Sequence, residues 1–153
     1  MKKLATVIFF LCSVTVLAQA ADESKVYRST EVDSKPNLKN GMYTLTKFVS
    51  DHFSYPEKIR NKQVKIFTSF IVETDGTMSD IKSFYISVKD LVPGDMVSIM
   101  TEEQKAFEQA QYAHMQAEAG RVLHLFRENW VPAQIGGKPV RCLYNYPISL
   151  NLE

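Results

Sequence analysis

Residues 64–88 read VKIFTSFIVETDGTMSDIKSFYISV, and they combine two strand-forming segments with a turn motif between them. Its first half is rich in β-branched and aromatic residues, which favour extended strands. Asp75-Gly76 at its centre is typical of a tight hairpin turn, because glycine readily adopts the positive φ that such a turn requires. The stretch therefore predicts two neighbouring antiparallel strands, at residues 64–73 and 78–88.

Each strand of this predicted hairpin has two faces, because successive side chains of a strand point to opposite sides of a sheet. In the first strand, Phe67 and Ile71 lie opposite a face that holds Val64, Ile66, Thr68, Phe70 and Val72. In the second strand, strict alternation places Phe84 and Ile86 opposite Ile81, Ser83 and Tyr85. Apolar side chains are thus expected on both faces of the sheet.

A short amphipathic helix is predicted before the hairpin, starting at Thr44. Its apolar residues recur at helical spacing at Leu45, Phe48, Val49 and Phe53. We expect this helix to end by Tyr55-Pro56, because the residue before a proline avoids the helical region.

A longer helical stretch is predicted after the hairpin. Thr101 and Gln104 have the spacing of a capping box at its start. Its apolar stripe is weak before Gly120 and stronger after it, so we expect a bend at that glycine. Residues 121–130 should form the helix that covers the sheet, with Trp130 and Pro132 ending it and filling the core.

The last predicted strand covers residues 138–152, where every second side chain from Val140 onward is apolar or aromatic. Pro147 lies on the opposite face and has no N–H to donate to a neighbouring strand, so we expect this strand at a sheet edge. Tyr144 and Tyr146 either line a peptide site at that edge or face the covering helix.

The N-terminus has the pattern of a signal peptide. Lys2 and Lys3 precede an apolar run of 14 residues, and Ala18-Gln19-Ala20 forms a cleavage site of small residues. An uncleaved inner-membrane anchor is the alternative, but a membrane-spanning helix needs about 20 apolar residues. We therefore expect export to the periplasm and cleavage after Ala20.

Three segments are predicted: a signal peptide at 1–20, a polar and flexible leader at 21–40, and one domain at 41–153. The signal peptide carries two of the 18 basic residues and none of the 17 acidic ones, so its removal leaves a formal net charge of −1. This charge argues against a nucleic-acid partner, which requires a basic excess. Cys142 is then the only cysteine, which excludes an internal disulfide and any cysteine-based zinc cluster.

No catalytic motif emerges, so we expect a protein without enzymatic activity. Gly-x-Ser-x-Gly, His-Glu-x-x-His and phosphate-loop patterns do not occur. His114 and Glu118 stand four residues apart and His124 follows, but a solvated helix face explains them better than a metal site. Neither a cofactor nor a metal is therefore predicted.

Four further motifs follow one another in a recognisable order. They are Tyr55-Pro56 after a short helix, Phe70-Ile71-Val72-Glu73-Thr74-Asp75-Gly76, Trp130-Val131-Pro132-Ala133 leading into Gly137-Lys138-Pro139-Val140, and Tyr146-Pro147-Ile148-Ser149-Leu150. In this order the chain resembles the C-terminal domain of TonB over about residues 43 to 153.

The resemblance implies an α+β fold with a small antiparallel sheet of about three strands and two main helices, in the order α-β-β-α-β. It also implies a periplasmic binding module, which adds an extended N-terminal segment of an outer-membrane receptor to its sheet edge and takes part in TonB-dependent transport across Gram-negative envelopes. The partner-binding residues on the last strand are then expected to be Arg141, Leu143, Tyr144, Asn145, Tyr146 and Ser149.

The chain departs from the family at several places. Val64 stands where the family often has glycine, and the segment at 87–119 is longer than usual. A leader of about 20 residues reaches roughly 70 Å when fully extended, which is short for a spacer that crosses the periplasm. Peptide binding is therefore expected without force transduction, and the alternatives are self-association through the same edge or an enzyme or inhibitor on a similar scaffold.

Overall fold

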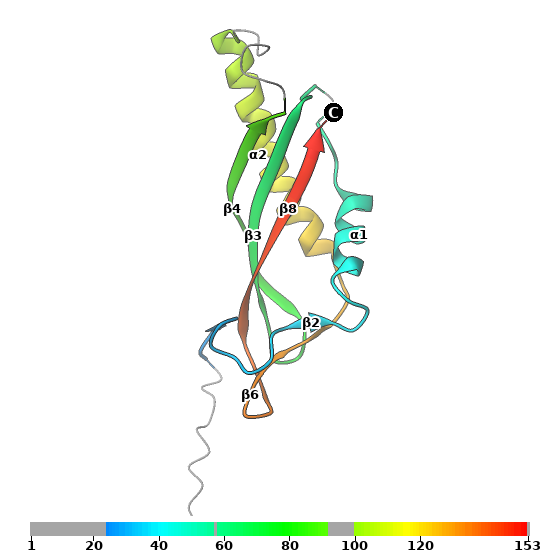
Figure 1. Ribbon diagram of the computed structural model, residues 1–153, viewed down its shortest axis with the longest axis vertical. Helices are drawn as coiled ribbons and strands as arrows, with labels where there is room; N and C mark the ends of the chain where they lie inside the picture. Colours follow the sequence, from blue (N-terminus) through cyan, green and yellow to red (C-terminus); the bar gives the residue numbers. More distant parts are fainter. Residues whose placement is uncertain (1–23, 57, 92–99, 153) are drawn as a thin grey trace, which may run out of the picture.

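The structure is a computed structural model, and it describes residues 24–56, 58–91 and 100–152. Over these residues the protein is α+β: two helices, α1 (Tyr43–His52) and α2 (Glu102–Leu125), accompany a curled and mostly antiparallel sheet (Figure 1). Within these residues no helix has the length and apolar character that a membrane crossing demands. The predicted signal peptide lies outside the described residues.

The main sheet has four strands in the order β1-β8-β3-β4. β3 (Lys62–Val72) and β4 (Met78–Asp90) form the predicted hairpin, and β8 (Cys142–Leu152) pairs antiparallel with the other side of β3. β1 (Tyr27–Arg28) runs parallel to the beginning of β8. Two helices and three long strands therefore follow one another in the predicted order α, β, β, α, β.

Four short strands complete the fold. β2 (Asn37–Leu38) pairs with β5 (Trp130–Val131), and β6 (Ala133–Ile135) pairs with β7 (Lys138–Val140) in a small hairpin at one end of the molecule (Figure 1). The segment predicted to be a flexible leader, at 21–40, thus contributes β1 and β2 to the folded domain.

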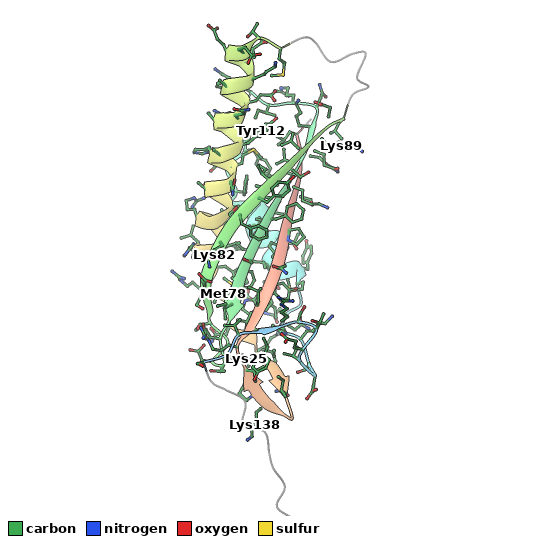
Figure 2. All side chains as sticks on the ribbon, turned by 90° about the vertical axis from the view of Figure 1, so that its left-hand side faces the viewer. Lys25, Met78, Lys82, Lys89, Tyr112 and Lys138 are labelled. Atoms are coloured by element: carbon green, nitrogen blue, oxygen red, sulfur yellow. The ribbon has the colours of Figure 1, made fainter. Side chains whose placement is uncertain are left out.

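One face of the sheet is buried against both helices. The β3 side chains predicted on one face are all buried there, and Leu45 and Val49 of α1 join them in one cluster with Met115, Ala119, Val122 and Leu123 of α2. Burial of this apolar area is the main source of stability, at about 25 cal/mol per Å² removed from water. The opposite face of β3 and β4 lies away from α2 (Figure 2).

The β3–β4 turn depends on Gly76. This glycine has φ of +85°, which a residue with a side chain adopts only under strain. Its carbonyl accepts the Trp130 N–H at 2.8 Å, and a Cβ at this position would collide with the Trp130 carbonyl oxygen. Asp75 accepts hydrogen bonds from the Thr77 N–H and hydroxyl at 2.9 and 2.7 Å. The Asp-Gly motif therefore forms the turn as predicted. Its glycine also holds β5 in place through the hydrogen bond from Trp130.

Two predictions about α2 are wrong. The helix runs without a break through Gly120, because a single glycine inside a helix costs only about 1 kcal/mol relative to alanine and is tolerated. It ends at Leu125, so Trp130 lies beyond the helix in β5 rather than within it. The predicted start is confirmed: Gln104 N–H donates to the Thr101 hydroxyl, and Thr101 N–H donates to the Gln104 side chain.

The predicted alternation along β4 is also wrong. A register shift occurs where Phe67 pairs with Tyr85 and the next residue, Thr68, pairs with Ser83, so Phe84 is an extra residue in the strand. Such a bulge reverses the alternation on one side of it. Ile81 and Ile86 therefore both pack against the core, and Phe84 and Tyr85 are both exposed.

The predicted last strand is divided in two. Its first three residues form β7 and fold back on β6 through Gly136 and Gly137, whose φ values are +57° and +75°. Arg141 separates β7 from β8. The alternation from Cys142 to Leu152 is as predicted, because the even-numbered side chains face the core or α1.

Candidate binding edge

The outer side of β8 is the candidate binding site. Its inner side pairs with β3 over the whole strand, from Cys142 to Leu152. On its outer side, β1 covers only Cys142 and Leu143. Among the described residues, no strand pairs with the outer side of β8 from Tyr144 onward.

Backbone groups at alternate residues of β8 point out of the sheet at this edge. The Arg141 carbonyl accepts the Tyr27 N–H at 2.9 Å, so the backbone of Arg141 faces outward. Because successive residues of a strand direct their backbone groups to opposite sides, Asn145, Pro147 and Ser149 also face outward. Pro147 thus sits where its missing N–H costs no hydrogen bond within the sheet, which agrees with its predicted place at an edge.

The two edges of the sheet differ in how well they are protected against pairing with a further strand. β4, at the far edge, carries charged residues, contains two register shifts and receives a side-chain hydrogen bond from Gln116 of α2 to the Ser83 carbonyl. Charges and bulges are the usual means by which proteins prevent unwanted strand pairing. β8 reads CLYNYPISLNL, with no charged residue and no register shift against β3, so Pro147 is its one protective residue.

The start of β8 is closed by the N-terminal segment. Tyr27 pairs with Cys142 and Arg28 with Leu143. Arg141 forms a two-pronged ion pair with Glu73, at 2.7 and 3.0 Å, and donates to the Ser24 carbonyl at 3.2 Å. Two of the predicted partner-binding residues, Arg141 and Leu143, are therefore already engaged within the chain.

Glu73 and Arg141 are held as a charged pair. The Arg141 guanidinium lowers the pKa of the Glu73 carboxyl, and Glu73 also accepts the Ser79 hydroxyl. Charge-assisted, two-pronged pairs of this kind fix geometry as well as adding energy. The end of β3 is thereby tied to the start of β8, which sets the register of the candidate edge.

Tyr144 and Tyr146 face the helices. The Tyr146 hydroxyl donates to the Thr46 hydroxyl at 3.2 Å, and the Tyr144 hydroxyl lies 3.6 Å from the Met42 sulfur. Burial raises the pKa of both tyrosine hydroxyls above the ordinary value, because it disfavours the charged form. The covering helix was expected at residues 121–130, but the hydroxyls of both tyrosines lie against α1 and the residue before it, and α1 lies beside β8 (Figure 1).

The other two predicted partner-binding residues are free at the edge. Asn145 and Ser149 are exposed, and their side chains lie on the face of the sheet that the helices do not cover. Tyr144, Asn145, Tyr146 and Ser149 are thus brought together along one unpaired stretch. Sequence reasoning missed the residues that limit this stretch, Tyr27 and Arg28, because a two-residue strand has no detectable periodicity.

The remaining motif residues support the fold. Phe70, Trp130 and Tyr144 form an aromatic cluster, with ring centroids 5.0 to 5.5 Å apart. Pro132 separates β5 from β6 and is half-buried. Tyr55 is exposed next to Phe53, and Tyr55 and Pro56 line a shallow cavity of about 320 Å³ together with Lys58, Phe107 and His114.

Glu118 is not part of a solvated helix face. It is 7% exposed, accepts the Ser54 N–H at 2.9 Å and pairs with Arg121 at 2.6 Å. Arg121 in turn donates to the His52 carbonyl, so this carboxylate joins α2 to the end of α1. The described part of the chain contains no group of three or more metal-ligating side chains.

Comparisons with known proteins give no further guide to this edge. No family model matches the chain, and no significant match was found among curated proteins or solved structures.

Proposed function

We propose that this chain is a non-catalytic binding protein that docks an extended peptide segment by adding it as a strand beside residues 144–152 of β8. The single observation that carries this proposal is the uncharged, unpaired outer side of that stretch. An extended peptide satisfies exposed N–H and C=O groups of a sheet edge, and its alternate side chains supply selectivity.

The chain limits the segment that it accepts. β1 closes the edge before Tyr144, so the docked peptide lies along at most nine residues of β8. Side chains of the peptide would alternate between the side next to α1 and the open face of the sheet. Thr46 of α1, whose hydroxyl accepts a hydrogen bond from Tyr146 at 3.2 Å, lies on the first of these sides.

The sequence resemblance to the TonB C-terminal domain supports one class of partner. It points to a periplasmic location and to the extended N-terminal segment of an outer-membrane receptor as the partner. The protein would bind this segment without transmitting force to the receptor. The order of the main elements, α1-β3-β4-α2-β8, is compatible with that resemblance.

Self-association is the second candidate function. The same uncharged edge offers no electrostatic barrier to pairing with the β8 strand of another copy. Two antiparallel β8 strands related by a two-fold axis would then continue the sheet from one protomer into its partner.

The edge is tested by the substitution Asn145→Pro. Proline removes an outward-facing N–H from β8 and leaves the core side chains unchanged, so we expect peptide affinity to fall about tenfold or more while the fold persists. The measurement is a titration with fluorescently labelled peptides from the N-terminal segments of outer-membrane receptors.

Asn145→Ala is the matched control, because it removes the same side chain but keeps the backbone donor. Circular dichroism reports on folding, and analytical ultracentrifugation reports on self-association. Equal binding by a folded proline variant and the control, or wild type that binds neither peptides nor itself, would rule out docking at this edge.

A further inference from the structure

The sheet face that the helices leave uncovered carries an ordered group of side chains. Phe67 of β3 pairs with Tyr85 of β4, and their ring centroids are 5.5 Å apart. Going along β3, Lys65 follows on the same face, and then Gln63 pairs with Lys89 on one side and with Asn151 on the other. We call the six residues Gln63, Lys65, Phe67, Tyr85, Lys89 and Asn151 the sheet platform.

The platform is accessible. Tyr85 is 57% exposed, Phe67 is partly exposed, and the other four residues are exposed. Val64 and Ile66, on the opposite face of β3, belong to the buried cluster that includes residues of both helices, and Figure 2 shows Lys89 on the side of β4 that points away from α2. Exposed aromatic rings in a contiguous group are typical of a binding surface.

The charge of the platform differs from that of the whole domain. Lys65 and Lys89 give it two positive charges, and the six residues include no carboxylate. The nearest acidic residue along β4, Asp90, is paired with Lys62. A domain with a formal net charge of −1 after signal cleavage therefore concentrates positive charge around two aromatic rings, which is complementary to an anionic ligand.

The amide side chains narrow the ligand class. Gln63 donates to Asn151 at 3.3 Å, and this amide pair retains further donors and acceptors for a polyhydroxylated ligand. The positively polarised C–H face of a sugar ring packs favourably on the electron-rich face of Phe or Tyr. Two lysines suit the few carboxylates of a short acidic oligosaccharide, whereas the long row of phosphates in a nucleic acid calls for a larger basic excess than a formal net charge of −1 supplies.

We infer that the sheet platform binds an acidic glycan, meaning a sugar polymer with carboxylate groups. Tyr85 and Phe67 stack on sugar rings, Lys65 and Lys89 pair with carboxylates, and the amide pair binds hydroxyls. Neighbouring strands lie about 4.8 Å apart and alternate residues about 6.8 Å apart, so the platform spans roughly 10 by 7 to 14 Å, enough for a short oligosaccharide. Five of the six platform residues belong to β3 and β4, and Asn151 is the one that lies on β8, the strand of the peptide edge.

The probe is a trimeric galacturonate, titrated by calorimetry into the purified full chain at low salt. A neutral glucose trimer and an oligothymidylate of similar length are titrated in parallel. We expect the acidic trimer to bind about tenfold more tightly than the neutral one, with affinity that falls as salt is raised.

Two variants test the named residues. Tyr85→Ala should weaken binding of the acidic trimer about tenfold, and Lys65→Gln with Lys89→Gln should remove the preference for acidic over neutral sugar. Tyr43→Ala and Lys138→Gln are the matched controls, because these residues are exposed elsewhere. Thermal unfolding verifies that each variant is folded.

Absence of binding by the acidic trimer would overturn the inference, as would equal losses in the Tyr43 and Tyr85 variants or tighter binding of oligothymidylate. Peptide binding at β8 should be unchanged in Tyr85→Ala, so failure of one proposal is distinguishable from failure of the other.

Discussion

Trp130 connects three parts of the molecule through one side chain. Its indole is 2% exposed and lies 5.3 Å from the ring of Phe70 and 5.0 Å from the ring of Tyr144, measured between centroids. Its backbone N–H donates to the Gly76 carbonyl. The residue therefore joins β5 to the β3–β4 turn and to β8.

Replacing Trp130 with alanine should lower the free energy of unfolding by about 3 to 5 kcal/mol, because a large buried ring is lost and a cavity remains. Chemical denaturation followed by circular dichroism measures the change. Tyr43→Ala, at a site that is 75% exposed, serves as the control and should cost little. A loss below about 1 kcal/mol for Trp130→Ala would contradict the packing role.

Glu118 gives the fold a defined dependence on pH. The Arg121 guanidinium, with the Ser54 N–H, lowers the pKa of this carboxyl from its ordinary value of 4.5 to about 2. A carboxyl whose pKa is lower in the folded state stabilises that state above its unfolded pKa. The contribution is therefore complete above about pH 4.5 and is lost as the pH falls toward about 2.

The substitution Glu118→Gln should cost about 1 to 3 kcal/mol at pH 7, because it removes the charge that Arg121 and the Ser54 N–H stabilise. The gap between wild type and variant should narrow as the pH is lowered from 4.5 toward 2, where the wild-type carboxyl also becomes neutral. Urea unfolding at a series of pH values measures this difference in the free energy of unfolding. A difference that stays constant with pH would exclude the Glu118–Arg121 ion pair as the cause of the loss.

Sequence patterns predicted side-chain burial well wherever the period was regular. The inward face of β3 is as expected, because five alternating residues report on one sheet face. Glu118 shows the limit of this reasoning. A carboxylate on a helix is predicted to be exposed to solvent unless a buried partner can be identified from the sequence. Its partner Ser54 is 64 residues away, a separation at which no local spacing predicts contact.

For whole helices and strands, the features that depend on residues close in the sequence were predicted correctly. The features that depend on strand pairing were not. The hairpin and the α2 capping box were predictable because turn and cap residues lie within a few positions of one another. The bulge at Phe84 and the division of the last strand at Arg141 depend on how the strands pair, which the spacing of residues within one strand does not specify. The unpaired edge of β8 was foreseen through Pro147, but its limit at β1 was not.

Helix α2 makes one element-scale prediction. Gly120 lies inside the helix, and a Cβ there would meet no atom within 4 Å. Gly120→Ala should therefore raise stability by about 0.5 to 1 kcal/mol, since alanine loses less backbone entropy in a helix. Thermal unfolding checks this, and Gly76→Ala is the contrasting variant, which should fold poorly because of its positive φ and its contact with Trp130. Destabilisation by Gly120→Ala would contradict the open space beside this residue.

Considered as a whole, the molecule closes one end of its sheet with its own N-terminal segment. Residues 24–38 contribute β1 and β2, and Gly136 N–H donates to the Asp33 side chain at 2.7 Å. Tyr27, Val32 and Ile135 pack over a small second core of Ala133, Val140 and Cys142. This arrangement leaves the Cys142 thiol fully buried, and burial raises its pKa.

The buried thiol supplies a direct reporter of whether β1 is docked. Tyr27→Pro removes the N–H that donates to the Arg141 carbonyl, so β1 should detach and expose Cys142. We expect the rate of reaction with a disulfide reagent such as DTNB to rise about tenfold or more, because losing one backbone hydrogen bond shifts local opening by roughly 1 kcal/mol and detachment removes the aromatic cover as well. Tyr27→Phe keeps the backbone donor and the ring, and it should react at the wild-type rate. Comparable rates for the proline and phenylalanine variants, with both proteins folded, would mean that the segment does not shield the start of β8. In that case the edge available to a peptide would extend to Cys142, and peptides longer by two residues should bind more tightly.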